Sequence, residues 1–183
     1  PVDAVMLARR AASFTRRSIK ADSKRSGLRL AVSMLYLTTL EGADSPELAR
    51  ALAQRAIHPC PVRLDQPVPS VAAVCVYPRL VPVVREALAG SGVKTASVAT
   101  SFPSGQAPLD ARLAETDAAI AAGADEIDMV ISRGAFLSGR FDEVAAEVRA
   151  VKEVCGDTHL KIILETGELA TPDNIRRCAD LVI

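Results

Sequence analysis

The 183-residue sequence contains no tryptophan, two tyrosines and four phenylalanines, so aromatic residues make up only 3% of it. It also lacks a net charge, because 22 Lys and Arg residues balance 22 Asp and Glu residues. Without a basic excess, the sequence argues against a partner that is a nucleic acid or an anionic membrane. No apolar run approaches the roughly 18 residues of a membrane-spanning helix.

The four cysteines and two histidines form no metal-binding or redox motif. No two cysteines are spaced as CxxC, and His58 and His159 are far apart in the sequence, so we expect no metal site. Free thiols are typical of a reducing compartment, and we therefore expect a cytoplasmic protein.

The first 30 residues are rich in Arg and Lys, and the sequence begins with Pro1 instead of Met. We expect a start that has been processed or trimmed, with a solvated helical extension over residues 1–30 and a single domain over residues 31–183. A mitochondrial presequence is the alternative, and Asp3 and Asp22 count against it.

Aliphatic residues dominate the remaining chain and follow a regular alternation. Short, β-branched runs bounded by turn residues predict buried strands over residues 72–77, 96–99, 126–131 and 160–165, with a weaker candidate over 34–40. Helical patterns over residues 45–58, 80–89, 108–122, 141–155 and 171–183 lie between or after them. Strands that alternate with helices predict an α/β fold with a parallel sheet.

Ionisable residues inside the apolar strands decide between two parallel architectures. An open sheet covered by helices on both faces offers no solvated position for Asp128, Lys161 and Glu165, whereas the lumen of a (β/α)8 TIM barrel does, near its C-terminal mouth. We therefore favour the barrel. Four prolines within residues 59–69 indicate a surface connection and not a domain linker.

The same polar residues are candidates for chemistry. Side chains alternate along a strand, so Lys161 and Glu165 share one face, and Asp128 meets them if its strand turns the same way. A buried lysine near a carboxylate can relay protons. An ion pair that only satisfies itself is the alternative.

Two further residues are candidates for substrate binding. Cys75 lies in the middle of a strand, where it either contacts a ligand or is a small core residue. Thr38 follows an apolar run, where its hydroxyl either binds a ligand or caps a turn. Residues 101–105 form a Gly/Pro/Ser turn after a strand, without a phosphate-loop pattern.

Five segments of the sequence, in this order, resemble the deoxyribose-phosphate aldolase family. They are LTTL (37–40), VCVYP (74–78), ASVA with FPSG (96–99 and 102–105), AGADEIDMV (122–130) and LKIILETGEL (160–169). The similarity runs from about residue 13 to residue 183.

This resemblance implies a class I aldolase on a (β/α)8 barrel, of which the chain covers about the first five βα units. Such enzymes reversibly cleave 2-deoxy-D-ribose 5-phosphate, a small phosphorylated sugar, through a lysine Schiff base and without a cofactor. The family's proton-relay aspartate falls on Asp128, its strand-five lysine on Lys161 and its substrate-side cysteine on Cys75. We predict that Thr38 and Glu165 also contact substrate.

The sequence departs from the family pattern at two places. Tyr36 stands where the family has an aspartate, and the family's Schiff-base lysine lies on a sixth strand that would follow residue 183. We therefore expect a chain without the family's C-terminal third, which is inactive by itself and forms oligomers through open sheet edges near Leu37 and Ile163. A non-catalytic partial barrel that persists through oligomerisation is the alternative.

Overall fold

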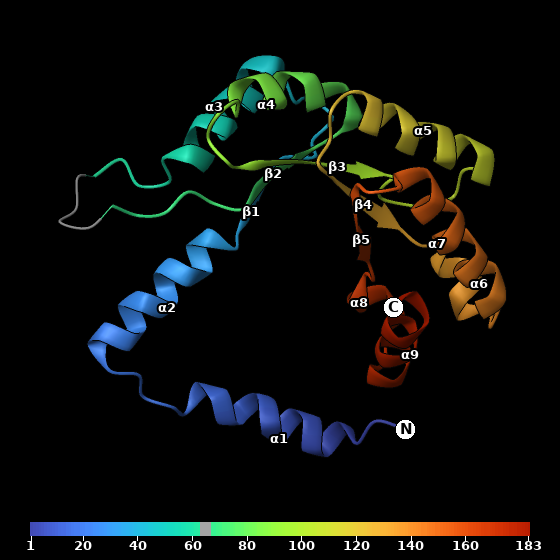
Figure 1. The fold of residues 1–183 in the computed structure, drawn as a ribbon. Coiled ribbons are helices and arrows are strands. Elements are labelled where there is room, and N and C mark those ends of the chain that lie inside the picture. Colours follow the sequence, from blue (N-terminus) through green and yellow to red (C-terminus); the bar gives the residue numbers. More distant parts are fainter. Residues whose placement is uncertain (63–66) are drawn as a thin grey trace.

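A computed structural model describes residues 1–62 and 67–183 of the chain. Its centre is a parallel sheet whose strand order follows the sequence from β1 to β5. The strands form an arc with helices on its outer side (Figure 1). They cover Tyr36–Thr38 (β1), Ala73–Val76 (β2), Lys94–Ala99 (β3), Glu126–Val130 (β4) and His159–Ile163 (β5). Each overlaps a predicted strand, and β3 and β5 begin two residues and one residue before the predicted start.

Helices connect the parallel strands, because each connection must return the chain to the same end of the sheet. These helices are α3 (Pro46–Ile57), the 3-10 helix η1 (Pro78–Leu80) with α4 (Val81–Ala87), α5 (Leu109–Ala121), and α6 (Arg133–Leu137) with α7 (Phe141–Cys155). Two more helices, α8 (Thr166–Leu169) and α9 (Pro172–Val182), follow β5. The predicted surface connection over 59–69 includes residues 63–66, which lie outside the described residues.

The sequence sets the start and the packing of α3 locally. The Ser45 side chain accepts a hydrogen bond from the backbone N–H of Leu48, and Pro46 occupies the first turn, where its missing N–H is not needed. Ala49, Ala53 and Ala56 are fully buried, because their spacing of four and three residues places them on one helix face. Their small side chains let α3 lie close to the sheet.

The two faces of the sheet differ in what covers them. Val74, Ile127 and Met129 belong to a cluster that includes buried residues of α3, α4, α5 and α7. The opposite face, which we call the inner face, carries another cluster, whose buried members all lie on strands. Its buried members are Ala73, Cys75, Ala96 and Val98.

The end of β5 corrects one sequence-based prediction. The predicted strand over 160–165 stops at Ile163, and Glu165 adopts a left-handed conformation, with φ of 53°, immediately before α8. Strand alternation therefore does not extend to Glu165, and this residue does not share the face of Lys161. The short helices α6 and α8 were also not predicted, because the sequence indicated only loops there.

The N-terminal extension consists of two helices, α1 (Ala4–Thr15) and α2 (Ala21–Ser33). Asp3 caps α1, since its carboxylate accepts hydrogen bonds from the N–H groups of Val5 and Met6. Neither helix contains a buried residue. In Figure 1, α2 leads into β1, and α1 runs across the open side of the arc towards α9, where the Val2 N–H donates a hydrogen bond to the Asp173 carboxylate.

The outermost strands of the sheet are β1 and β5. Within the described residues, β1 pairs only with β2 and β5 only with β4, which matches the edges predicted near Leu37 and Ile163. In the described part of the chain, no helix has both the length and the apolar character needed to cross a membrane.

Candidate active site

Asp128 lies in the middle of β4 and projects onto the inner face. Its neighbours Ile127 and Met129 point to the helix-covered face, so alternation directs Asp128 the other way. Only 10% of its side chain is exposed. Burial raises the pKa of the Asp128 carboxyl above its ordinary value, and the contact with Lys161 opposes this effect. Because burial raises this pKa and the ammonium lowers it, the Asp128 carboxyl is suited to gain and lose a proton during a reaction.

Lys161 lies directly beside Asp128 on the next strand. The two residues are register partners of β4 and β5, so their side chains leave the sheet in the same direction. The Lys161 Nζ atom lies 2.9 Å from the Asp128 Oδ1 atom. The predicted meeting of these two side chains is therefore observed. At this distance the two side chains form an ion pair, and the lysine of an ion pair has no lone pair for attack on a carbonyl.

Cys75 on β2 approaches the other oxygen of the same carboxylate. Its thiol donates a weak hydrogen bond to the Asp128 Oδ2 atom, with Sγ at 3.7 Å. Burial, reinforced by the charge of Asp128, raises the pKa of the Cys75 thiol to about 12. The thiol thus stays protonated at neutral pH and acts as a donor to Asp128, not as a nucleophile.

Tyr36 and Glu126 also lie on the inner face, and together with Asp128, Lys161 and Cys75 they form what we call the inner-face group. Sequence reasoning did not select Tyr36 or Glu126 as a site residue. The Tyr36 hydroxyl donates a hydrogen bond to the Glu126 Oε2 atom. The Nζ atom of Lys161 lies 3.7 Å from the centroid of the Tyr36 ring, which is a cation–π contact. Alternation could have identified Glu126, because it lies two residues before Asp128 on the same strand.

The two other predicted substrate-binding residues differ in their placement. Thr38 is exposed at the end of β1 and is the register partner of Cys75, so its side chain leaves the sheet on the inner face beside that residue. Glu165 is exposed and lines a separate cavity. The predicted convergence of Glu165 with Asp128 and Lys161 is therefore wrong, because β5 ends before Glu165.

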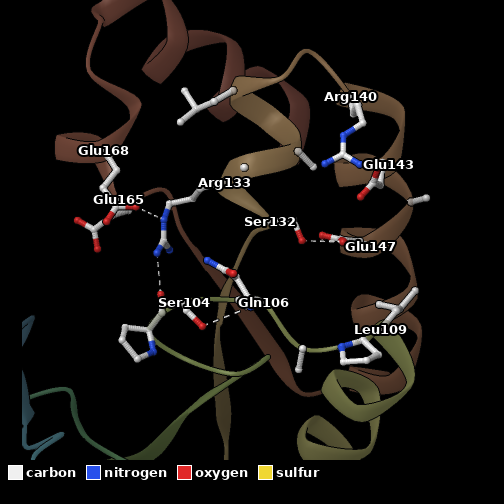
Figure 2. A pocket seen from close by; sticks show the side chains of 18 residues that line it. Ser104, Gln106, Leu109, Ser132, Arg133, Arg140, Glu143, Glu147, Glu165 and Glu168 are labelled. Atoms are coloured by element: carbon white, nitrogen blue, oxygen red, sulfur yellow. Dashed lines mark hydrogen bonds and ion pairs between the residues drawn. The ribbon is translucent and has the colours of Figure 1, made fainter.

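That cavity has a volume of about 1100 Å³ and lies among the turn after β3, α6, α7 and the start of α8 (Figure 2). Arg133 crosses it, with an ion pair from Nε to Glu168 and a hydrogen bond from Nη2 to the Pro103 carbonyl oxygen at 2.9 Å. Neither Asp128 nor Lys161 lines this space. The cavity and the inner-face group are thus two distinct places.

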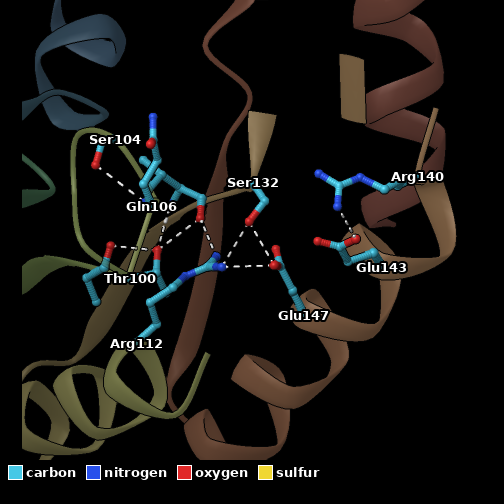
Figure 3. Close-up of polar contacts among 10 residues, drawn as sticks. Thr100, Ser104, Gln106, Arg112, Ser132, Arg140, Glu143 and Glu147 are labelled. Atoms are coloured by element: carbon cyan, nitrogen blue, oxygen red, sulfur yellow. Dashed lines mark hydrogen bonds and ion pairs between the residues drawn. The ribbon is translucent and has the colours of Figure 1, made fainter. Parts of the chain in front are cut away.

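A buried ion pair supports the strand ends from the outside (Figure 3). Arg112 of α5 is 1% exposed, and its Nη1 atom lies 3.0 Å from the Glu147 Oε1 atom of α7. Its Nη2 atom donates to the Val130 carbonyl oxygen at 3.2 Å. The Ser132 hydroxyl donates to Glu147 at 2.7 Å. Together these contacts attach the end of β4 to both α5 and α7.

The predicted Gly/Pro/Ser turn after β3 is held in an unusual backbone conformation. Thr100 and Ser101 have φ values of 62° and 61°, and the buried Thr100 hydroxyl both donates to and accepts from the Val130 backbone. Gly105 also has positive φ, and a Cβ atom there would lie 2.9 Å from the Ile131 carbonyl oxygen. This position therefore requires glycine.

Parallel βα units with a lysine–carboxylate pair on their inner face define part of a (β/α) barrel of the kind that carries chemistry on its strands. Residues 38–183 match the family described as DeoC/LacD family aldolase, and the chain belongs to that family. Within residues 1–62 and 67–183, no three His, Cys, Asp or Glu side chains are grouped so that they could hold a metal ion.

Individual relatives agree with this assignment. The chain is 39% identical over 172 residues to deoxyribose-phosphate aldolase from Mus musculus, covering 90% of this chain and 54% of the relative. It is 39% identical over 173 residues to the Homo sapiens enzyme, with the same coverage. The chain thus spans about half the length of the curated relatives it matches.

A solved structure supports the barrel architecture. The tetrameric deoxyribose phosphate aldolase from Aeropyrum pernix superimposes with a TM-score of 0.65 at 24% identity, over 84% of this chain and 61% of that one. The predicted TIM-barrel fold, of which the chain contains five consecutive strands, is confirmed.

Proposed function

We propose that this chain supplies the first five strands of a deoxyribose-phosphate aldolase. The reaction is the reversible cleavage of 2-deoxy-D-ribose 5-phosphate into D-glyceraldehyde 3-phosphate and acetaldehyde. The contact between Asp128 and Lys161 on the inner face carries the proposal, since it joins a buried carboxyl to a fixed ammonium. The names of the relatives support the same reaction.

Asp128 is proposed as the proton relay. A lysine amine condenses with the sugar carbonyl and releases water, and the resulting iminium accepts the electron pair when the C2–C3 bond breaks. The C3 hydroxyl gives its proton to the Asp128 carboxylate, directly or through a water, and becomes the aldehyde of glyceraldehyde 3-phosphate. The remaining enamine then takes a proton at its terminal carbon, from Asp128 or through a water, before hydrolysis releases acetaldehyde.

Lys161 and Cys75 are proposed to fix the orientation of the Asp128 carboxyl, the proposed proton relay. The Lys161 ammonium lies at one carboxylate oxygen of Asp128, and the Cys75 thiol donates to the other. With both oxygens occupied, the carboxyl group has one orientation, which is what a relay needs in order to meet the same substrate carbon each time. Cys75 and Thr38 are proposed to lie beside the substrate.

The condensing amine is proposed to come from a sixth strand that pairs with β5. Lys161 is poorly suited to that role, because its Nζ atom is already engaged by the Asp128 carboxylate at 2.9 Å and by the ring of Tyr36 at 3.7 Å from the centroid. The edge of β5 is where the next strand of a barrel would add.

Complementation tests this proposal. The part of the Mus musculus relative that the chain does not match is fused to residue 183, and the products from deoxyribose phosphate are followed by proton NMR. We expect acetaldehyde from the fusion and none from the chain alone. Borohydride reduction followed by peptide mass mapping should place the adduct on a lysine of the added segment. An adduct on Lys161 would reverse the two lysine roles.

A non-catalytic partial barrel is favoured neither by the inner-face geometry nor by the names of the relatives. The complementation experiment separates it from the aldolase, since a fusion that folds cooperatively, binds no substrate and yields no product would support the non-catalytic form. Lysine-to-methionine exchange in the added segment is the matched inactive control for the active fusion.

We also propose a cytoplasmic enzyme of deoxyribonucleotide catabolism that forms homo-oligomers. The free cysteines support the compartment, and the tetrameric Aeropyrum pernix relative supports the assembly. Cell fractionation and light scattering test these two points.

The division into an extension over 1–30 and a barrel unit over 31–183 is proposed because α1 and α2 contain no buried residue, and because Val32, in the last turn of α2, is where the chain begins to pack against the core cluster. Limited trypsin digestion should cleave these helices first and leave the barrel unit intact. Early cleavage inside residues 73–163 would contradict this division.

A further inference from the structure

The Tyr36 side chain reaches across the inner face to a strand that is not its neighbour. Tyr36 lies on β1, whereas its hydrogen-bond partner Glu126 lies on β4, with β2 and β3 between them. On the way the ring packs against the cluster that contains Ala96 and its own register partner Ala73. Two alanines at these positions leave the space that a ring needs to pass, and Ala96 is the register partner of Glu126.

The face of the Tyr36 ring contacts the ammonium of Lys161, which in turn contacts the proposed relay Asp128. The Lys161 Nζ atom lies 3.7 Å from the Tyr36 ring centroid and 2.9 Å from the Asp128 Oδ1 atom. The Lys161 ammonium is therefore contacted from two sides, by the ring of Tyr36 on β1 and by the carboxylate of Asp128 on β4. The Lys161 side chain is 40% exposed, so without the ring its long aliphatic chain would be free to turn towards solvent.

The hydroxyl of Tyr36 donates a hydrogen bond to a second carboxylate on β4, that of Glu126. Glu126 lies two residues before Asp128 on β4, and its charge acts on the Asp128 carboxyl. The Tyr36 hydroxyl donates to the Glu126 Oε2 atom, and burial together with this bond raises the pKa of Tyr36, so it remains a donor. The ionisable groups that face the pair are thus Cys75 from β2, Glu126 from β4 and Tyr36 from β1.

We propose that Tyr36 is a positioning residue for the proposed proton relay Asp128. Its ring holds the Lys161 ammonium against Asp128, while its hydroxyl donates a hydrogen bond to Glu126. An aspartate at this position would place a second carboxylate near the same ammonium, whereas the tyrosine ring contacts the ammonium without a charge of its own. The catalytic part of this inference rests on the proposed aldolase function, whereas the positioning itself does not.

NMR on the 183-residue chain tests the positioning without any turnover. Protons above an aromatic face are shielded, so the ε-methylene signal of Lys161, assigned by its loss in Lys161→Met, should be shifted upfield. Tyr36→Phe keeps the ring and should keep this shift, whereas Tyr36→Leu should lose it. In Tyr36→Leu the Asp128 carboxyl should also titrate at higher pH than in Tyr36→Phe, because its cation has moved away.

The outcomes are distinct. A Lys161 signal at its ordinary position in the unchanged chain overturns the proposal, even if Tyr36→Leu fails to fold. An Asp128 titration that is equal in folded Tyr36→Leu and Tyr36→Phe also overturns it and leaves Tyr36 as a space-filling residue. Circular dichroism and thermal melting establish which variants are folded.

The complemented enzyme separates this inference from the proposed function. If the unchanged fusion cleaves deoxyribose phosphate, Tyr36→Leu should lower kcat about 10-fold with little change in KM, since orientation of a relay contributes part of the roughly 10²-fold or more of acid–base catalysis. Tyr36→Phe should lie closer to the unchanged enzyme. A fusion without activity, together with the expected NMR result, would reject the proposed function and retain the positioning role.

Discussion

At the scale of single residues, the Asp128 carboxyl is the group on which the other inner-face side chains act. It receives an ammonium on one oxygen and a thiol on the other, and it is almost entirely shielded from water. Burial raises its pKa, so the protonated form is accessible at a higher pH than for an ordinary aspartate. This allows proton uptake and release within one catalytic cycle.

Exchange of Asp128 for asparagine should separate catalysis from stability. In the complemented enzyme, we expect Asp128→Asn to lower turnover by roughly 10²-fold or more, because the amide cannot exchange a proton. The melting temperature should hardly change, since Lys161 is 40% exposed and its ammonium can be hydrated when the carboxylate is lost. Steady-state kinetics and thermal melting give the two quantities.

The opposite pattern would identify Asp128 as a purely structural partner of Lys161. In that case Asp128→Asn reduces stability by several kcal/mol, as for a broken buried pair, and leaves the turnover of the folded molecules intact. Lys161→Met is the matched variant, because it removes the cation and keeps the proton-exchanging carboxyl.

The stability of the chain should fall as the pH rises above about 9. Burial raises the pKa of the Cys75 thiol from its ordinary 9.0 to about 12. Between these two values the unfolded chain loses the thiol proton while the folded chain keeps it, so the unfolded state is favoured by up to about 1.4 kcal/mol per pH unit. Denaturant unfolding at several pH values measures this slope.

Cys75→Ala is the control for this prediction, and only the slopes are compared, because the smaller side chain also lowers stability by itself. We expect a shallower alkaline decline in the variant. Equal slopes would show that the decline comes from other groups, of which Tyr36 is the next candidate, because burial also raises the pKa of its hydroxyl.

At the scale of elements, the ion pair between Arg112 and Glu147 connects α5 and α7 across the end of β4. We expect Arg112→Met to destabilise the fold by about 3–5 kcal/mol, because the Glu147 carboxylate would remain buried without its cation. Urea unfolding followed by circular dichroism measures the loss.

The double variant Arg112→Met with Glu147→Leu distinguishes a charge effect from a packing effect. Replacing a whole buried pair by apolar side chains is often neutral, so most of the lost stability should return. A double variant as unstable as the single one would show that the hydrogen bonds to Val130 and Ser132, and not the paired charges, support these elements.

Elements with a long, regular pattern could be predicted from the sequence, whereas short ones could not. The apolar stripe of α7 spans fifteen residues, and Val144, Val151 and Cys155 are buried as its period requires. The helix α6 has only five residues, too few for a periodic signal. The strand β5 ends early because Glu165 adopts a left-handed conformation, which no apolar pattern reports.

The same limit applies to the candidate site. Asp128 and Lys161 could be predicted to meet because they lie on neighbouring strands and each interrupts an apolar run. The contact between Tyr36 and Glu126 joins strands separated by two others, so it depends on the curvature of the sheet and on the small side chains of Ala73 and Ala96 between them. Neither property follows from local periodicity.

At the scale of the whole molecule, unpaired strand edges and exposed apolar side chains should make the chain associate. In the described residues, β1 and β5 each have one paired side, and backbone groups at such edges recruit further strands. The extension adds exposed apolar side chains, which include Val5, Met6, Leu7, Phe14, Leu28 and Leu30.

Sedimentation velocity of the 183-residue chain should therefore show dimers or larger species whose fraction rises with concentration. Fusion to the complementing segment should remove the species that depend on the edges. A concentration-independent monomer with a cooperative thermal transition would contradict this expectation, and removal of residues 1–30 distinguishes association through the extension from association through the sheet.

The sequential strand order has a consequence for synthesis on the ribosome. Because β2 pairs with β1, β3 with β2, and so on, each strand after β1 pairs with a strand that was made before it. The backbone pairing of each βα unit can therefore form at translation speed, about 5–20 residues per second, whereas the contacts of Tyr36 on β1 with Glu126 and Lys161 form only after β4 and β5 have been made. The nascent chain therefore grows its sheet in one direction, and the strand that recruits the next one is always the strand made last.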